Sequence, residues 1–244
     1  RHDEDSEFGG QDTGSASYAY AFAPNWRASV SAGNAFRAPT LFQRFSIYGD
    51  PSLRPETARN FELGLNYALQ STRFGIVLYR NQIDDLINYV SGPGSCVNGS
   101  GKYPGCYGNT KRARLEGLTL SGARSLAGFN LSASLDLQNP RDLDSGKLLA
   151  RRSRRHATLA ADTRVARWQL GAELQLSGQR YDDKDNKTAL GGYGLLNLHA
   201  STEVAPHVTL QARVDNLADK DYQLANGYYT PGRLFYLGLK WSPQ

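Results

Sequence analysis

The sequence contains no methionine and no long apolar run, and the second absence limits how the chain can relate to a membrane. A transmembrane helix needs about 18 or more consecutive apolar residues, and no such run occurs. Membrane-spanning strands are not excluded, because only alternate residues of such strands are apolar. The chain opens at Arg1 without an initiator methionine or a signal peptide, so we interpret it as a mature product or a fragment.

Cysteine and histidine are too few and too scattered to predict a metal centre or an active site. The four histidines are dispersed, and no GxSxG, HExxH or Walker motif is present. His199 and Ser201 fall on one polar strand face, where filling of a lumen explains them better than an esterase pair does. We therefore expect no enzyme activity, no cofactor and no bound metal. Cys96 and Cys106 share one Gly/Pro/Ser-rich loop, which predicts a local disulfide and an oxidising compartment.

The formal charge of +5 and the isoelectric point of about 9.2 raise the question of a nucleic-acid partner. The basic residues are spread among predicted strands and loops rather than gathered on one segment. Solvated walls and loops explain this distribution better, so we expect no nucleic-acid partner.

Alternation of apolar and polar residues predicts an all-β, antiparallel, up-and-down protein. The clearest strands are 208–217 and 231–241, whose apolar residues share one face and whose polar residues share the other. The same pattern predicts about twelve strands. Their ranges are 1–8, 14–22, 26–34, 59–69, 72–90, 108–124, 128–139, 153–165, 167–180, 192–203, 207–217 and 231–241.

The predicted connections alternate between short and long, which places all the short turns at one end of the sheet. Short turns follow residues 22, 69, 124, 165 and 203, and long loops cover 35–58, 91–107, 140–152, 181–191 and 218–230. Transmembrane β-barrels of the bacterial outer membrane have short periplasmic turns and longer extracellular loops. We therefore predict a multi-pass outer-membrane barrel with extracellular long loops and a periplasmic C-terminus.

Large aromatic residues lie beside the short turns, on the apolar face of their strands. Such a row indicates the aromatic girdle of a membrane barrel. A soluble β-sandwich, the main alternative, has no reason to place aromatics beside each short turn. The residues are Phe22, Trp26, Tyr67, Phe74, Phe129, Trp168 and Trp241.

Several motifs in order resemble the C-terminal barrel of the TonB-dependent outer-membrane receptors. Three further segments, 148–152, 178–185 and 227–233, resemble the cobalamin (vitamin B12) receptors of that family most closely. The family motifs cover nearly the whole chain and lie at 34–41 (NAFRAPTL), 50–56 (DPSLRPE), 61–65, 79–87, 115–118, 214–222 (VDNLADKDY) and 231–233.

The resemblance implies energy-coupled uptake of cobalamin or a related corrinoid through a plugged barrel of about 22 strands. Residues 1–244 would then be the C-terminal portion of that barrel, without the plug domain that contacts TonB and without the first barrel strands. A siderophore receptor for iron chelates, or a complete small barrel acting as a pore or hydrolase, are the alternatives. The expected partners are cobalamin or another large metal chelate, TonB, outer-membrane lipid and lipopolysaccharide.

Four loop residues are the predicted ligand contacts. The cluster Arg151, Arg152, Arg154 and Arg155 would begin a strand at the extracellular rim, with one side facing lipopolysaccharide phosphates and the other the ligand. The resemblance places a ligand-contacting arginine at Arg151 or Arg152, and a ligand contact at Tyr228. Tyr228 and its neighbour Tyr229 offer flat, amphipathic rings to a large macrocycle, or else form an upper aromatic belt.

Overall fold

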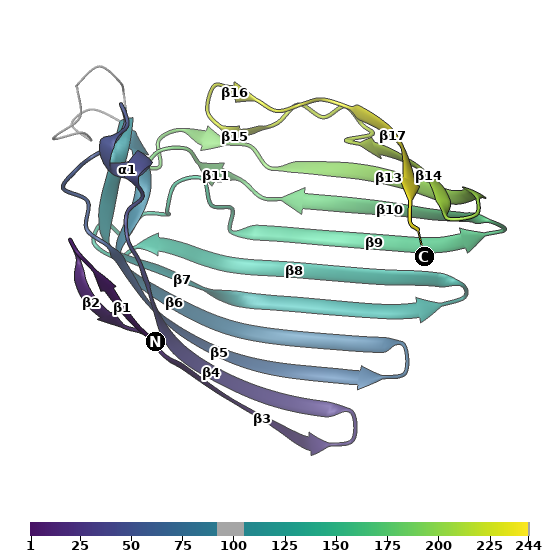
Figure 1. The fold of residues 1–244 in the computed structure, drawn as a ribbon, viewed down its shortest axis with the longest axis horizontal. Coiled ribbons are helices and arrows are strands. Elements are labelled where there is room, and N and C mark those ends of the chain that lie inside the picture. Colours follow the sequence, from purple (N-terminus) through teal and green to yellow (C-terminus); the bar gives the residue numbers. More distant parts are fainter. Residues whose placement is uncertain (92–104, 244) are drawn as a thin grey trace.

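A computed structural model describes residues 1–91 and 105–243, which form one large antiparallel sheet with small additions (Figure 1). The sheet has 11 strands in the order β17-β14-β13-β10-β9-β8-β7-β6-β5-β4-β3, so neighbours in the sequence are neighbours in space. The strands are β3 (Ser15–Ala23), β4 (Trp26–Arg37), β5 (Glu56–Leu69), β6 (Thr72–Ser91), β7 (Gly105–Leu126), β8 (Phe129–Asp142), β9 (Arg155–Val165), β10 (Trp168–Ser177), β13 (Tyr193–Ala205), β14 (Val208–Asp215) and β17 (Leu234–Trp241).

The five short turns are confirmed at one end of the sheet, and each contains two residues. Two-residue hairpins match the twist of their strands only when turn residues adopt positive φ. Each turn contains such a residue other than glycine, and one turn has a glycine with positive φ as well. The positive-φ residues are Asn25, Gln70, Ala127 with Gly128, Ala166 and His207. The long connections gather at the opposite end (Figure 1).

The outward face of the sheet is apolar and is bordered by aromatic rings beside the short turns. Trp26 pairs with Tyr67, which pairs with Phe74 on the next strand, and the Trp26 and Tyr67 ring centroids are 4.9 Å apart. At the edge strand, Leu237 is 78% exposed and Trp241 70% exposed. The tryptophans lie on well-separated strands, so they do not pack together in one dry interior.

Short elements outside the sheet correct several predicted ranges. Residues 1–8 do not form a strand of the wall, because a turn after Asp5 folds them into a separate hairpin. The predicted loop at 35–58 contains a helix, and two other long loops contain short hairpins. These elements are β1 (His2–Asp5), β2 (Gly9–Asp12), α1 (Leu41–Phe45), β11 (Arg180–Tyr181), β12 (Ala189–Leu190), β15 (Gln223–Ala225) and β16 (Tyr228–Tyr229). Among the described residues there is no helix, α1 included, that could cross a membrane.

Candidate ligand-binding site

A cavity of about 850 Å³ opens among the long loops, within the size range of small-molecule sites. Four separate parts of the chain build it: α1 and the segment after it, the adjoining ends of β6 and β7, the β8–β9 loop, and the β15–β16 hairpin. We call it the aromatic cavity. Its lining residues are Phe42, Tyr48, Tyr89, Tyr107, Arg151, Leu224, Ala225, Tyr228, Tyr229 and Thr230.

Aromatic rings pack edge to face along one wall of the aromatic cavity. The ring of Tyr89 lies 5.8 Å from that of Tyr107 and 6.0 Å from that of Tyr48, and Phe42 lies 6.1 Å from Tyr107. Edge-to-face pairs at such distances are favourable beyond the area they bury. The backbone N–H of Tyr107 also donates to the carbonyl of Tyr48 at 2.8 Å, so this wall is held by main chain as well as by rings.

The helix α1 brings Phe42 to this wall and is fixed at both ends. Thr40 and Gln43 form a capping box, with N–H to side-chain distances of 3.2 and 2.9 Å. At the other end, the buried guanidinium of Arg44 makes a two-pronged ion pair with Glu7, in the turn between β1 and β2. The β1–β2 hairpin therefore anchors the segment that carries Phe42.

Arg151 is the only charged side chain among the described residues that line the cavity. Its Nε donates to Oδ1 of Asp182 at 2.7 Å, and its guanidinium lies 5.8 Å from the Tyr89 ring. The same Asp182 oxygen accepts the backbone N–H of Asn226 at 3.1 Å. Asp182 thus joins the β8–β9 loop to the β15–β16 hairpin, and its charge offsets that of Arg151.

The structure corrects the predicted arrangement of the arginine cluster. Strand β9 begins at Arg155, and Arg151 has a left-handed backbone with φ of 60°, so alternation does not sort Arg151 to Arg154 between two faces. Of the two predicted ligand contacts in this cluster, Arg151 lines the cavity and Arg152 does not. Burial lowers the pKa of Arg152, against the opposing influence of Glu56.

Tyr228 and Tyr229, the other two predicted ligand contacts, line the cavity and are highly exposed, at 73% and 87%. Rings so exposed in the free structure are available to cover a ligand. Their hairpin is held by Thr230, whose hydroxyl donates to the Tyr222 carbonyl at 2.8 Å, and by buried Arg180, which donates to the Gln223 carbonyl at 2.8 Å.

The acidic loop tip after β11 forms a folded turn. Asp183 accepts backbone N–H groups of Asp185, Lys187 and Thr188. Burial alone would raise the pKa of Asp183, but the N–H donors, with Thr188 the strongest, hold it below its usual value. Across the described residues, no group of three or more His, Cys, Asp or Glu side chains is placed to hold a metal ion.

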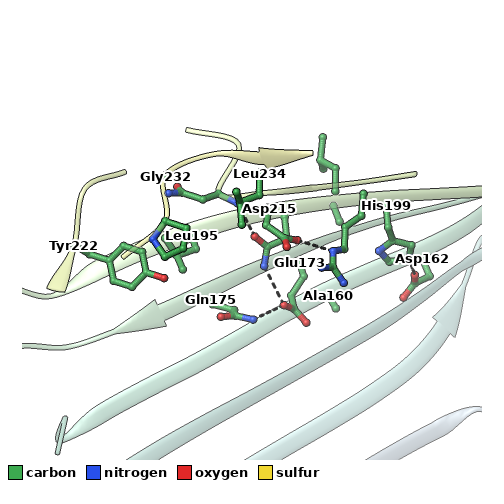
Figure 2. A pocket seen from close by; sticks show the side chains of 16 residues that line it. Ala160, Asp162, Glu173, Gln175, Leu195, His199, Asp215, Tyr222, Gly232 and Leu234 are labelled. Atoms are coloured by element: carbon green, nitrogen blue, oxygen red, sulfur yellow. Dashed lines mark hydrogen bonds and ion pairs between the residues drawn. The ribbon is translucent and has the colours of Figure 1, made fainter. Parts of the chain in front are cut away.

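A second, polar cavity of about 540 Å³ lies along the inward faces of β9, β10, β13 and β14 (Figure 2). Glu173 accepts from Gln175 at 2.6 Å and from Asn197 at 3.3 Å, and His199 Nε2 lies 3.0 Å from Asp162. These bonded side chains show that polar residues gather on the inward face.

The esterase pair considered for this face is not supported by its hydrogen bonds. Ser201 donates to Gln169 at 3.4 Å, whereas His199 is engaged with Asp162. A Cβ at Gly171 would overlap the His199 ring, so the glycine gives the imidazole room to reach its partner. His199 and Asp162 are thus a structural pair in the wall.

The predicted disulfide involves Cys96, which lies outside the described residues, so this pairing stays a prediction. Cys106 is described and is 3% exposed near the start of β7.

Sequence reasoning predicted three of the ten lining residues, namely Arg151, Tyr228 and Tyr229. Phe42, Tyr48, Tyr89 and Tyr107 were not predicted, because their contacts depend on loops that are distant in the sequence. One signal in the sequence could have indicated the helix that carries Phe42: Thr40 begins a T-x-x-Q pattern, which is typical of a capping box at the start of a helix.

Comparisons with known proteins agree with the fold described above. The family model described as "TonB dependent receptor-like, beta-barrel" matches residues 1–217. The copper transporter OprC is 20% identical with a TM-score of 0.76, and the match covers 94% of this chain and 39% of OprC.

Two siderophore receptors give similar matches. A mutant of the ferric enterobactin receptor PfeA from Pseudomonas aeruginosa, in complex with enterobactin, is 23% identical with a TM-score of 0.76, and the match covers 98% of this chain and 42% of the receptor. The ferric-catecholate import receptor Fiu from E. coli is 18% identical with a TM-score of 0.69, covering 96% and 35%. At these identities the likeness establishes the fold, and the present chain spans about two fifths of the length of these proteins.

Proposed function

We propose that this chain, which belongs to the TonB-dependent receptor β-barrel family, is part of an outer-membrane transporter for cobalamin or a related corrinoid. Family membership supports the outer membrane as its location and a role in receptor-mediated transport rather than catalysis. The remaining barrel strands, a plug domain and coupling to TonB are proposed for the intact receptor. The long loops would then be extracellular and the short turns periplasmic.

The observation that carries the proposal is the chemistry of the aromatic cavity. Its described lining is dominated by six aromatic rings, and its one cation, Arg151, is offset by Asp182. A corrinoid is a large, flat, amide-rimmed macrocycle with little net charge. Such a ligand is matched by aromatic faces and hydroxyl groups rather than by a cluster of cations.

A ferric siderophore is the second candidate, and it has its own support. Neighbours in fold include receptors named for ferric enterobactin and ferric catecholate. Ferric catecholates are multiply anionic, and in the described part of the chain the exposed Arg154 forms no ion pair with a carboxylate. Arg154 is where an anionic chelate would gain its attraction, whereas Arg152 is partly buried and interacts with Glu56.

The test is equilibrium binding of cyanocobalamin and of a ferric catecholate to the intact receptor that contains this chain. We expect cyanocobalamin to bind, and Tyr228→Ala and Arg151→Ala each to weaken it, by about tenfold for the tyrosine. Tyr20→Ala, on the outward face of β3, is the matched control and should bind like wild type.

The dependence of binding on ionic strength distinguishes the two candidate ligands. Corrinoid binding should change little between low and high ionic strength, whereas binding of an anionic catecholate should weaken as salt screens the arginines. Cyanocobalamin affinity that is unchanged in both Tyr228→Ala and Arg151→Ala would refute the proposed site. Tight, salt-sensitive catecholate binding with no corrinoid binding would favour the siderophore reading.

A further inference from the structure

Five arginines form a band across the outward face of β5 to β9, just beyond the apolar part of that face towards the long loops. Cross-strand register shows the change from apolar to basic. One row joins Leu63, Leu78, Leu118 and Leu137, with Arg155 next to it on β9. The next two rows towards the long loops contain the other four arginines. We call the five residues together the arginine band: Arg59, Arg80, Arg114, Arg141 and Arg155.

Within this band the positive charges are poorly compensated. Glu116 is the one acid in the same rows, and it is shared by Arg80 at 3.0 Å and Arg114 at 3.4 Å. Among the described residues, no acidic side chain forms an ion pair with Arg59, Arg141 or Arg155. Charge beyond the band is already matched, because Arg112 in the next row pairs with Asp144 at 2.7 Å.

Arg114 and Arg141 make the imbalance sharpest, because the register places them directly opposite each other. Like charges directly opposite on neighbouring strands are destabilising. Arg141 donates to Asn139 and to the Gly146 carbonyl, which are neutral acceptors. The Nε of Arg114 is buried and has no hydrogen-bond partner. An anion between the two guanidiniums would remove both defects.

The depth of the band fits a lipid headgroup. Arg141 follows Phe129, at the short-turn girdle, by 12 residues along β8, which is roughly 40 Å of strand. At the tilt of about 40° usual for membrane barrels, this is roughly 30 Å along the membrane normal, just past an apolar band of about 25 Å. Arg141 and its row partners Arg59 and Arg114 therefore lie where phosphates of the leaflet on the long-loop side are expected, with Arg80 one row and Arg155 two rows closer to the membrane centre.

We propose that the arginine band binds the phosphate groups of lipopolysaccharide on the outside of the barrel. Guanidinium groups bind phosphate with paired N–H donors, and clusters of arginine beside a membrane attract anionic headgroups. The proposal rests on the membrane orientation proposed above, with the long loops outside. It does not involve the aromatic cavity, whose lining comes from other residues.

The test uses the intact receptor, purified in detergent and stripped of lipid, with Arg114→Gln and Arg141→Gln combined. Arg124→Gln is the matched control, since Arg124 lies on β7 with the same facing as Arg114 but beside the short turns. Lipopolysaccharide is then added, and the lipid A retained per receptor is measured. We expect the double variant to retain about tenfold less than wild type or Arg124→Gln.

Thermal stability gives a second readout, in which the effect of the double substitution should differ without and with lipopolysaccharide. Without lipid, the double variant should be at least as stable as wild type, because opposed like charges have been removed. With lipopolysaccharide, wild type should gain more stability than the variant does. A variant that is less stable without lipid and gains as much as wild type would overturn the proposal.

Two additional arms identify the source of the phosphate. Lipopolysaccharide with its lipid A phosphates removed should be retained poorly by wild type, and inorganic phosphate should compete weakly. Equal retention of the dephosphorylated lipid, or full competition by free phosphate, would contradict a lipid site. Cyanocobalamin affinity should be unchanged in the double variant, so this proposal and the transport proposal fail separately.

Discussion

Asp182 is the residue whose removal should reveal how the aromatic cavity is held together. Its Oδ1 accepts from Arg151 at 2.7 Å and from the backbone of Asn226 at 3.1 Å. Asp182→Ala removes both contacts at once. The β8–β9 loop and the β15–β16 hairpin would then have to be brought together by the ligand itself.

The size of the effect follows from these two hydrogen bonds. Arg151 is partly exposed, with a side-chain exposure of 39%, so solvent screening limits its pair to about 1 kcal/mol. The Asn226 N–H bond to a carboxylate contributes about another 1 kcal/mol. Together they bound the loss at about 2 kcal/mol, or roughly 30-fold in affinity. Because Arg180 and Thr230 still hold the hairpin, we expect about tenfold.

The assay is corrinoid binding by the intact receptor, combined with hydrogen exchange of the segment 222–230. Asp185→Ala is the control, since Asp185 lies in the same loop and its ion pairs within the described residues are weak ones with Lys184 at 3.5 Å and Lys147 at 4.0 Å. Exchange in 222–230 should accelerate in Asp182→Ala alone. If both variants bind and exchange alike, the structural role assigned to Asp182 is wrong.

Two further predictions concern carboxylates of the loop end. Glu56→Gln should lower the stability of the receptor by about 1 kcal/mol, because the buried Glu56 carboxylate accepts hydrogen bonds from Arg37 and from the Ile87 N–H, each at 2.6 Å, while the Arg37 side chain is 53% exposed. An unchanged melting temperature would count against this role of Glu56. The pKa of Asp183 is held below its ordinary value of 3.8, so its stabilisation of the loop should be full above that value and be lost as pH falls through the lower folded pKa. Hydrogen exchange of 183–188 should therefore stay slow at pH 5 in wild type, and Asp183→Asn should exchange fast there; equal rates would contradict the assignment.

The wall of the barrel could be predicted from the sequence because one face of the sheet is apolar and the other is polar. Each strand therefore carries its own signal, and the five short turns follow from where the alternation stops. The prediction of a wall strand at residues 1–8 was wrong, because the acidic stretch around Glu4 alternates weakly and the chain turns back after Asp5. A strand range read from polar residues alone has no buried face to fix its register.

The cavity could be predicted only in part, for a different physical reason. Arg151, Tyr228 and Tyr229 were found through motifs, whereas Tyr48 and Tyr107 join the site through a backbone bond between distant loops. The strand assumed for Arg151 fails at its positive φ, a conformation that no alternation pattern reveals. Loop sites depend on tertiary contacts, which period-two patterns do not encode.

Ion pairing at the loop end explains why a basic protein can present a nearly neutral cavity. Arg37, Arg44, Arg54, Arg112 and Arg151 each have a carboxylate partner: Glu56, Glu7, Asp85, Asp144 and Asp182. These pairs set loop geometry more than they add stability, since most are partly exposed. Among the described residues, Arg59, Arg141 and Arg155 of the outward arginine band have no such carboxylate partner.

Because Asp182 pairs with Arg151, substituting Asp182 should affect the binding of the two candidate ligands differently. Its removal loosens the cavity and also frees the charge of Arg151. A corrinoid with little net charge meets only the loosening, so its affinity should fall. A multiply anionic catecholate would gain attraction from the freed guanidinium, so its affinity should fall less or rise. Opposite responses of two ligands to one substitution are not produced by simple misfolding, because a misfolded receptor loses both.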